Sequence, residues 1–243
     1  MAFYPIYYIT LVCPDLATSE RKIREYIDHG ARALQMDMPS KDPVFETPFV
    51  RENMKRALRI YEGYDTYLDF FRRIREKYPY LELHLVAYPD VVERIGREKF
   101  VSFCKEINIT SFMPVSSDQE YRCSFKKDGL VVIENMDVNL PDAEVEYAAG
   151  LKENEVITLN YRRHRECTRQ DCAGFRDKIN YLRRQGVTAK VYAVEGIVNA
   201  GMMKEVKEAG AERAFVGNVL MKLWDDEKSL WELFDAFQEL AGP

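Results

Sequence analysis

The sequence lacks a long apolar run and an excess of basic residues. No stretch of about 18 consecutive apolar residues occurs in the 243-residue chain, so no membrane-spanning helix is expected. The net charge is −5, which argues against general nucleic-acid binding. Segment 1–13 is apolar but lacks a basic region and a small-residue cleavage site, and we interpret it as a first strand rather than a signal peptide. The predicted partners therefore include neither nucleic acid nor a membrane.

The sequence also lacks the pattern of a disulfide framework. Its five cysteines are odd in number and irregular in spacing, which favours ordinary thiols in a reducing cytoplasm. Cys167 and Cys172 lie five positions apart, which is not the CxxC spacing of a zinc or redox site. No other spacing requires a metal or a cofactor, so we predict neither.

What the chain does have is an alternation of strand and helix patterns. Apolar residues make up 47% of the sequence and charged residues 31%, which is ordinary for a globular protein. Eight short runs are rich in β-branched or aromatic residues and are bounded by Gly, Pro, Asp or Asn, as strands are. The predicted strands span residues 6–13, 32–38, 81–89, 109–115, 130–136, 155–161, 189–197 and 213–220.

Between these strands, apolar residues recur at helical spacing. The first of the predicted helices would be capped by Thr18 or Ser19 and stopped by Gly30. The third would be capped by Asn199 and stopped by Gly210. The helices predicted in this way span residues 18–30, 66–79, 199–210 and 228–240.

Strands that each precede a helical segment predict an α/β protein with a (β/α)8 barrel, the TIM barrel. The alternative is a doubly wound sheet, which usually has a glycine-rich first turn. The first turn here reads Cys13-Pro14-Asp15 and contains no glycine, which favours the barrel. No linker, repeat or low-complexity run divides the chain, so we predict a single domain over residues 1–243.

The carboxyl ends of the last two strands carry glycines. These ends read Glu195-Gly196 and Gly217-Asn218, and barrels often bind phosphate at this place through backbone N–H groups that glycine exposes. The alternative is that both glycines only turn the chain, and Glu195 would repel a phosphate. The sequence therefore allows two interpretations of Gly196, Gly217 and Asn218, namely a phosphate-binding site or turns without a ligand.

A basic run follows the sixth strand. Arg162 and Arg163 precede a histidine and a further arginine, and such a run can clamp an anionic substrate or form a docking patch. The alternative is a solvated basic turn. A small anionic or phosphorylated substrate is the predicted ligand under the first interpretation.

Several motifs, taken in order, resemble the tryptophan synthase α-subunit family. Segment 8–15, YITLVCPD, resembles the family's first strand and turn. Segment 30–43, GARALQMDMPSKDP, resembles its second strand, which reads like GADALELGIPFSDP. Segment 196–220 resembles its closing phosphate-binding segment, and weaker matches at ENMKRAL, FFRRIREKYP and LVAYPD extend the resemblance over most of the chain.

The resemblance implies a lyase of tryptophan biosynthesis. The family splits indole-3-glycerol phosphate into indole and glyceraldehyde 3-phosphate by a retro-aldol route. One carboxylate acts as general acid and base on the glycerol side, and another takes the indole N–H proton. On this resemblance Glu46 stands in place of the aspartate near the indole nitrogen, and Gln35 in place of the catalytic glutamate. Tyr8 and Tyr88 would line the substrate pocket, together with Glu195.

Two departures from the family pattern bear on activity and on partners. Gln35 cannot exchange a proton at any useful pH. Segment 113–116, MPVS, does not match the stretch through which the α-subunit meets the β-subunit, so a β-subunit partner is in doubt. The aromatic-rich segment 66–80 is compatible with a homo-oligomer.

Asp37 is the candidate replacement for the missing acid. Strand side chains alternate, so Asp37 points to the same side as Gln35, where the family has glycine. In one hypothesis Asp37 is the general acid and base, and Gln35 is its hydrogen-bonding neighbour. In the other, Asp37 only accepts a hydrogen bond from a loop N–H group.

Three functions follow from these alternatives. The first is a lyase that still acts on indole-3-glycerol phosphate through Glu46 and Asp37. The second is a diverged paralogue that acts on another anionic small molecule, because barrels change chemistry through their loops. The third is a non-catalytic barrel that binds a ligand or a partner, which the amide of Gln35 favours and the clustered acids oppose. Whether the chain is an enzyme is left open by the sequence.

Overall fold

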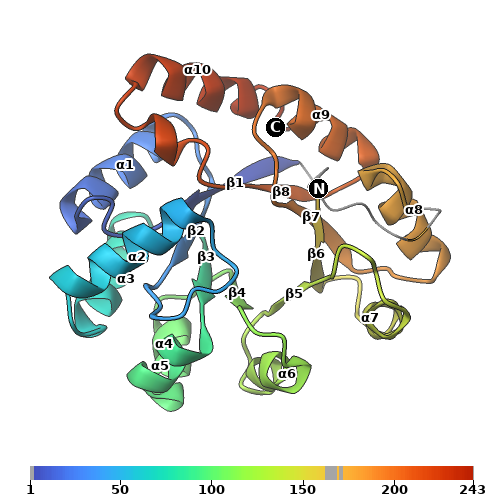
Figure 1. The fold of residues 1–243 in the computed structure, drawn as a ribbon, viewed down its shortest axis with the longest axis horizontal. Helices are drawn as coiled ribbons and strands as arrows, with labels where there is room; N and C mark the ends of the chain where they lie inside the picture. Colours follow the sequence, from blue (N-terminus) through green and yellow to red (C-terminus); the bar gives the residue numbers. More distant parts are fainter. Residues whose placement is uncertain (1–2, 162–168, 170–171, 243) are drawn as a thin grey trace. The chain divides into compact units, whose positions relative to one another are not determined.

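The computed structural model describes residues 3–161, 169 and 172–242. Eight parallel strands form one sheet in the order β4-β3-β2-β1-β8-β7-β6-β5, and helices alternate with them along the chain (Figure 1). This is the (β/α)8 barrel topology, so the predicted fold class is confirmed. The strands are β1 Tyr4–Ile9, β2 Ala33–Asp37, β3 Glu82–Ala87, β4 Ser111–Pro114, β5 Ile133–Asn135, β6 Val156–Asn160, β7 Lys190–Val194 and β8 Arg213–Val216.

The helices follow their capping signals, with one correction. The first helix begins earlier than predicted, because Asp15 is its N-cap and its side chain accepts from the Thr18 N–H. Asn199 caps α9 as predicted, and Gly210 ends it in the left-handed conformation. The helices are α1 Leu16–Asp28, α2 Pro48–Ile60, α3 Asp65–Lys77, α4 Pro89–Ile95, α5 Arg97–Glu106, α6 Gln119–Lys127, α7 Asp142–Ala149, α8 Phe175–Arg184, α9 Ala200–Ala209 and α10 Glu227–Gln238, with a 3₁₀ turn, η1, at Met221–Leu223.

The chain divides into two compact units, which are described separately. The first contains residues 1–7 and 133–243, and the second contains residues 8–132. Strand β1 contributes to both, since its residues 4–7 pair with β8 in the first unit. The prediction of a single domain over 1–243 stays a prediction.

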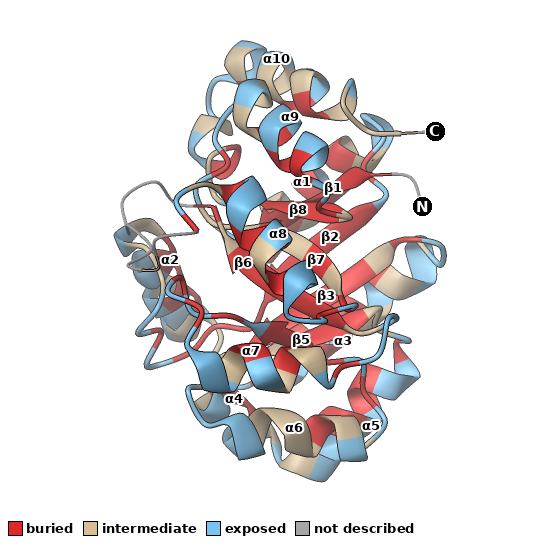
Figure 2. Ribbon diagram, turned by 90° about the vertical axis from the view of Figure 1, so that its right-hand side faces the viewer, coloured by how far each residue is buried: buried red, intermediate tan, exposed pale blue. Residues whose placement is uncertain are grey.

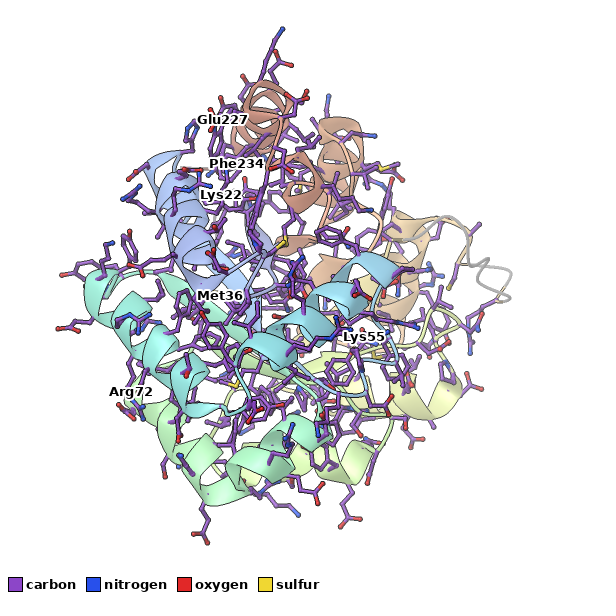
Figure 3. All side chains as sticks on the ribbon, turned by 60° about the vertical axis from the view of Figure 1, so that its left-hand side comes forward. Lys22, Met36, Lys55, Arg72, Glu227 and Phe234 are labelled. Atoms are coloured by element: carbon purple, nitrogen blue, oxygen red, sulfur yellow. The ribbon has the colours of Figure 1, made fainter. Side chains whose placement is uncertain are left out.

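In the second unit, the strands are buried and the helices expose one face to solvent (Figure 2). Met36 of β2 is fully buried in the region between α1 and α3 (Figure 3). An aromatic cluster is made by Phe100, Phe112 and Phe125, which are all fully buried. The Phe112 ring centroid lies 5.1 Å from that of Phe100 and 4.9 Å from that of Phe125.

In the first unit, the Tyr7 ring of β1 stacks on Phe234 of α10 with a centroid distance of 4.3 Å. Both side chains are buried, so α10 packs an apolar face against β1. Within the described part of the chain no helix is both long and apolar enough to cross a membrane. Its cysteines at positions 13, 104, 123 and 172 form no disulfide.

Candidate active site

Asp37 is the last residue of β2 and is fully buried. Its Oδ2 accepts a hydrogen bond of 2.5 Å from the Tyr8 hydroxyl, and its Oδ1 accepts one of 3.2 Å from the Leu11 N–H. Burial raises the pKa of Asp37 from 3.8 to about 6, and hydrogen bonds from Tyr8, Thr10 and Leu11 oppose that rise. A carboxyl group with such a pKa can both give and take a proton near neutral pH.

Glu46 is the second carboxylate of this site. It lies half-buried in the loop between β2 and α2, and its Oε1 accepts a hydrogen bond of 3.2 Å from the Tyr88 hydroxyl. Burial, followed by the charges of Asp37 and Glu46, raises the pKa of Tyr8. Burial and then Glu46 raise the pKa of Tyr88, with a smaller contribution from Asp37. The two carboxylates therefore act on the same pair of tyrosine hydroxyls, and the four side chains form one cluster.

Gln35 is buried next to this cluster but does not take part in it. Its Nε2 donates to the Met113 Sδ at 3.9 Å, and this side chain makes no other hydrogen bond with the residues that the structure describes. The hypothesis that Gln35 is the hydrogen-bonding neighbour of Asp37 is therefore wrong, because Tyr8 occupies that place. The loop N–H contact expected in the alternative hypothesis is present, and it comes from Leu11.

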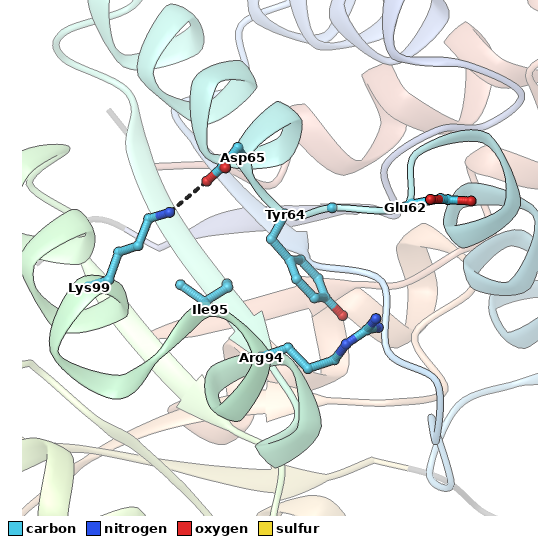
Figure 4. A pocket seen from close by; sticks show the side chains of 7 residues that line it. Glu62, Tyr64, Asp65, Arg94, Ile95 and Lys99 are labelled. Carbon is cyan, nitrogen blue, oxygen red and sulfur yellow. Dashed lines mark hydrogen bonds and ion pairs between the residues drawn. The ribbon is translucent and has the colours of Figure 1, made fainter.

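The segment after β2 is fixed by side chains from two neighbouring helices. Asp90, at the start of α4, accepts from the Ser40 hydroxyl at 2.6 Å and from the Lys41 N–H at 2.9 Å. The Tyr64 hydroxyl donates to the Pro39 carbonyl at 2.7 Å. Tyr64 and Arg94 line a surface pocket of about 260 Å³, where the Arg94 guanidinium lies beside the Tyr64 hydroxyl (Figure 4). These contacts hold the backbone between Asp37 and Glu46 in one conformation.

The predicted anion-binding residues lie in the first unit. Strands β7 and β8 are parallel neighbours, so the segments that follow them begin at the same edge of the sheet. Glu195 and Gly196 both have positive φ, at 58° and 85°. Gly217 does not have positive φ, and a Cβ atom placed on it would meet no atom within 4 Å. The local structure therefore does not itself require glycine at 217, and Asn218 follows directly.

Two further points concern the basic run after the sixth strand and the arrangement of possible metal ligands. Arg162 and Arg163 lie outside the described residues. Among the residues that the structure describes, no group of three His, Cys, Asp or Glu side chains is arranged to hold a metal ion.

The sequence interpretation missed the residues that support Asp37 from α2. Asn53 is buried, and its Nδ2 donates to the Leu11 carbonyl at 2.8 Å and to the Thr10 hydroxyl at 3.3 Å. The available signal was a polar residue within the apolar stripe of α2, since Val50, Met54 and Ala57 are its buried neighbours on that helix.

The raised pKa of Asp37 predicts a pH dependence of stability. An acid with a folded pKa of about 6 and an unfolded value near 3.8 binds more protons in the folded state, so its contribution to stability falls as pH rises from about 4 to about 6. The size is about 3 kcal/mol. Denaturant unfolding at pH 4 and pH 7 should show the wild type losing this amount relative to Asp37→Asn. If the free energies of unfolding of the two proteins change with pH in parallel, the raised pKa of Asp37 is contradicted.

Asp37 ends a parallel strand of the barrel, Glu46 lies in the loop that follows it, and each carboxylate accepts a hydrogen bond from a tyrosine hydroxyl. The family model "Tryptophan synthase alpha chain" matches residues 2–154 of the chain. The chain belongs to the tryptophan synthase alpha chain family, as the sequence motifs predicted.

Individual relatives agree with this assignment. The tryptophan synthase alpha chain of Actinobacillus pleuropneumoniae serotype 5b (strain L20) is 25% identical over 99% of this chain and 89% of its own. A solved structure from Aquifex aeolicus VF5 matches with a TM-score of 0.83 at 20% identity, covering 99% of this chain and 93% of that one. The tryptophan synthase complex from Pyrococcus furiosus matches with a TM-score of 0.80 at 16% identity, covering 97% and 98%. The two structural matches support the fold.

Proposed function

We propose that this protein is a carbon–carbon lyase of the retro-aldol type that acts on indole-3-glycerol phosphate or a closely related anionic molecule. The observation that carries the proposal is the cluster of Asp37, Glu46, Tyr8 and Tyr88, in which two carboxylates face one pair of hydroxyls. Membership of the tryptophan synthase alpha chain family supports the same reaction class.

The proposed chemistry divides the proton transfers between the two acids. Asp37 gives its proton to C3 of the indole ring, and Glu46 takes the proton from the ring nitrogen. Asp37 then takes the proton of the hydroxyl next to the ring, the carbon–carbon bond breaks, and the carbonyl of the aldehyde forms. The electron pair returns to the ring and the nitrogen recovers its proton from Glu46, so protons balance over the cycle. A pKa near 6 lets Asp37 serve in both directions.

The glycines after β7 and β8 support recognition of the phosphate group. Gly217 has open space where a side chain would lie, which would let an anion reach its backbone N–H. Helix α9 begins at Ala200, close after Gly196 in sequence, and a helix N-terminus favours negative charge. We assign Gly196, Gly217 and Asn218 to the phosphate and leave Glu195 to the polar part of the substrate.

The test is to incubate the purified protein with indole-3-glycerol phosphate and to measure indole by absorbance or chromatography. We expect indole release that falls about 10²–10⁴-fold in Glu46→Gln, because glutamine cannot take the ring proton. Absence of any indole from the wild type, under conditions where the protein is folded, would reject the proposed substrate.

A second candidate function rests on Gln35, whose amide makes its hydrogen bond to the Met113 sulfur and offers no titratable proton. Under this alternative the chain is a diverged paralogue with another anionic substrate. The Gln35→Glu variant separates the two. A gain of indole release from a silent wild type would show an intact scaffold that lacks one acid, whereas silence in both proteins favours the different substrate, to be sought by thermal shift with phosphorylated metabolites.

A further inference from the structure

A chain of hydrogen bonds connects helix α2 to Asp37. The Arg56 guanidinium donates to the Asn53 Oδ1. Asn53 Nδ2 then donates to the Thr10 hydroxyl at 3.3 Å, and the Thr10 hydroxyl is hydrogen-bonded to the Asp37 carboxylate. Because Asn53 is the donor to Thr10, the Thr10 proton remains available for the carboxylate. The Thr10 side chain is also hydrogen-bonded to Tyr8, so it contacts two groups of the cluster.

Asn53 also fixes the backbone that holds the other oxygen of Asp37. Its Nδ2 donates to the Leu11 carbonyl at 2.8 Å, and the Leu11 N–H donates to the Asp37 Oδ1 at 3.2 Å. The next residue, Val12, has φ of 61°, which is unusual for a β-branched residue and persists only where neighbours hold it. Ser19 Oγ accepts from the Val12 N–H at 3.0 Å, so α1 secures the segment as α2 does.

We propose that Asn53 is a positioning residue, which orients Thr10 and Leu11 as donors to Asp37 and thereby sets the proton affinity of that carboxyl group. The proposal deepens the proposed function, since it rests on Asp37 as the general acid and base. Asn53 acts through Thr10 and Leu11, because its side chain is hydrogen-bonded to them and to Arg56 rather than to Asp37.

Other titratable groups lie near Asp37. Within the second unit these are Tyr8 from β1, Tyr67 from α3, Tyr88 after β3, and Glu46 through the tyrosines that it shares with Asp37. None of these four accepts or donates a hydrogen bond with Asn53 among the interactions described. A change at Asn53 should therefore leave their contacts in place, except the hydrogen bond between Tyr8 and the Thr10 side chain.

The test is a carbon-13 NMR titration of the Asp37 carboxyl group, which reads its pKa whether or not the protein turns over a substrate. In Asn53→Ala we expect the pKa of Asp37 to rise by about one unit, since donors that favour the ionised form lose their orientation. Thr10→Val should give a shift of the same sign without opening a cavity at Asn53. In the double variant, the effect of Asn53→Ala should be reduced, because part of it passes through Thr10.

The matched control is Lys55→Ala, an exposed position on the same helix (Figure 3), for which no shift is expected. If the wild type releases indole, the acid limb of the pH–rate profile should shift in Asn53→Ala by the same amount as the Asp37 pKa measured by NMR. A folded Asn53→Ala protein whose Asp37 titrates within about 0.2 units of the wild type would overturn the proposal. If the titration shifts but no indole is ever formed, the positioning role stands and only the proposed reaction fails.

Discussion

Asp37→Asn should reduce indole release by about 10²–10⁴-fold, which is the usual contribution of a general acid or base. The asparagine oxygen can still accept the hydrogen bond that the Tyr8 hydroxyl now gives to Asp37, but the amide NH2 group cannot accept the one from the Leu11 N–H. What disappears is the exchangeable proton, because an amide does not titrate in the useful range. The measurement is kcat and KM from steady-state assays, with kcat expected to carry most of the loss.

The control for this variant is Glu52→Gln, which removes one negative charge from an exposed position on α2. Its rate should stay within a factor of two or so of the wild type, since exposed charges contribute little at this distance from the chemistry. A loss of less than about tenfold in Asp37→Asn would remove Asp37 from the catalytic role and leave it as a structural acid.

Phe112→Ala should destabilise the protein by about 3–5 kcal/mol, the range for truncating a buried phenylalanine. Phe112 is fully buried in β4, and its ring contacts those of Phe100 and Phe125 at 5.1 Å and 4.9 Å between centroids. Alanine leaves a cavity and also removes the tilted ring contact with Phe100 and the edge-on contact with Phe125. Urea denaturation followed by circular dichroism gives the change in the free energy of unfolding.

Tyr80→Ala is the matched control, since this ring is 96% exposed. This substitution should change the free energy of unfolding by less than about 0.5 kcal/mol, as is typical of surface positions. If Phe112→Ala lowers the free energy of unfolding by less than about 1.5 kcal/mol, the neighbouring rings must move into the cavity. The packing of this aromatic cluster would then be less rigid than its ring contacts indicate.

The fold was predictable because its signals are local and repeated. Each of the eight strands lies within the predicted runs or overlaps them, as β2 at Ala33–Asp37 does with the predicted 32–38. The first strand was placed too late, since β1 covers Tyr4–Ile9 rather than 6–13. Apolar residues continue past Ile9 into a buried loop, and composition alone does not separate a buried loop from a strand.

The site was predictable only in part, because its contacts join segments distant in sequence. The alternation of side chains along a strand placed Gln35 and Asp37 on the same side of β2. The hydrogen-bonding partner of each side chain, however, comes from another element. Tyr8 reaches Asp37 across 29 positions, and Gln35 reaches Met113 across 78. No periodic pattern reports such pairs. The doubt about a β-subunit partner, which rests on segment 113–116, stays a prediction.

Helix α2 has thirteen residues and supports both carboxylates of the cluster. Arg51 on its first turn donates to the Glu46 carbonyl at 2.7 Å and to the Val44 carbonyl at 2.9 Å, while Asn53 supports the donors to Asp37. The two acids therefore cannot be re-engineered independently. An insertion or deletion that changes the phase of this helix would displace Glu46 and misalign the donors to Asp37 in a single event. Any transplant of the loop after β2 into another barrel must therefore carry residues 48–56 with it.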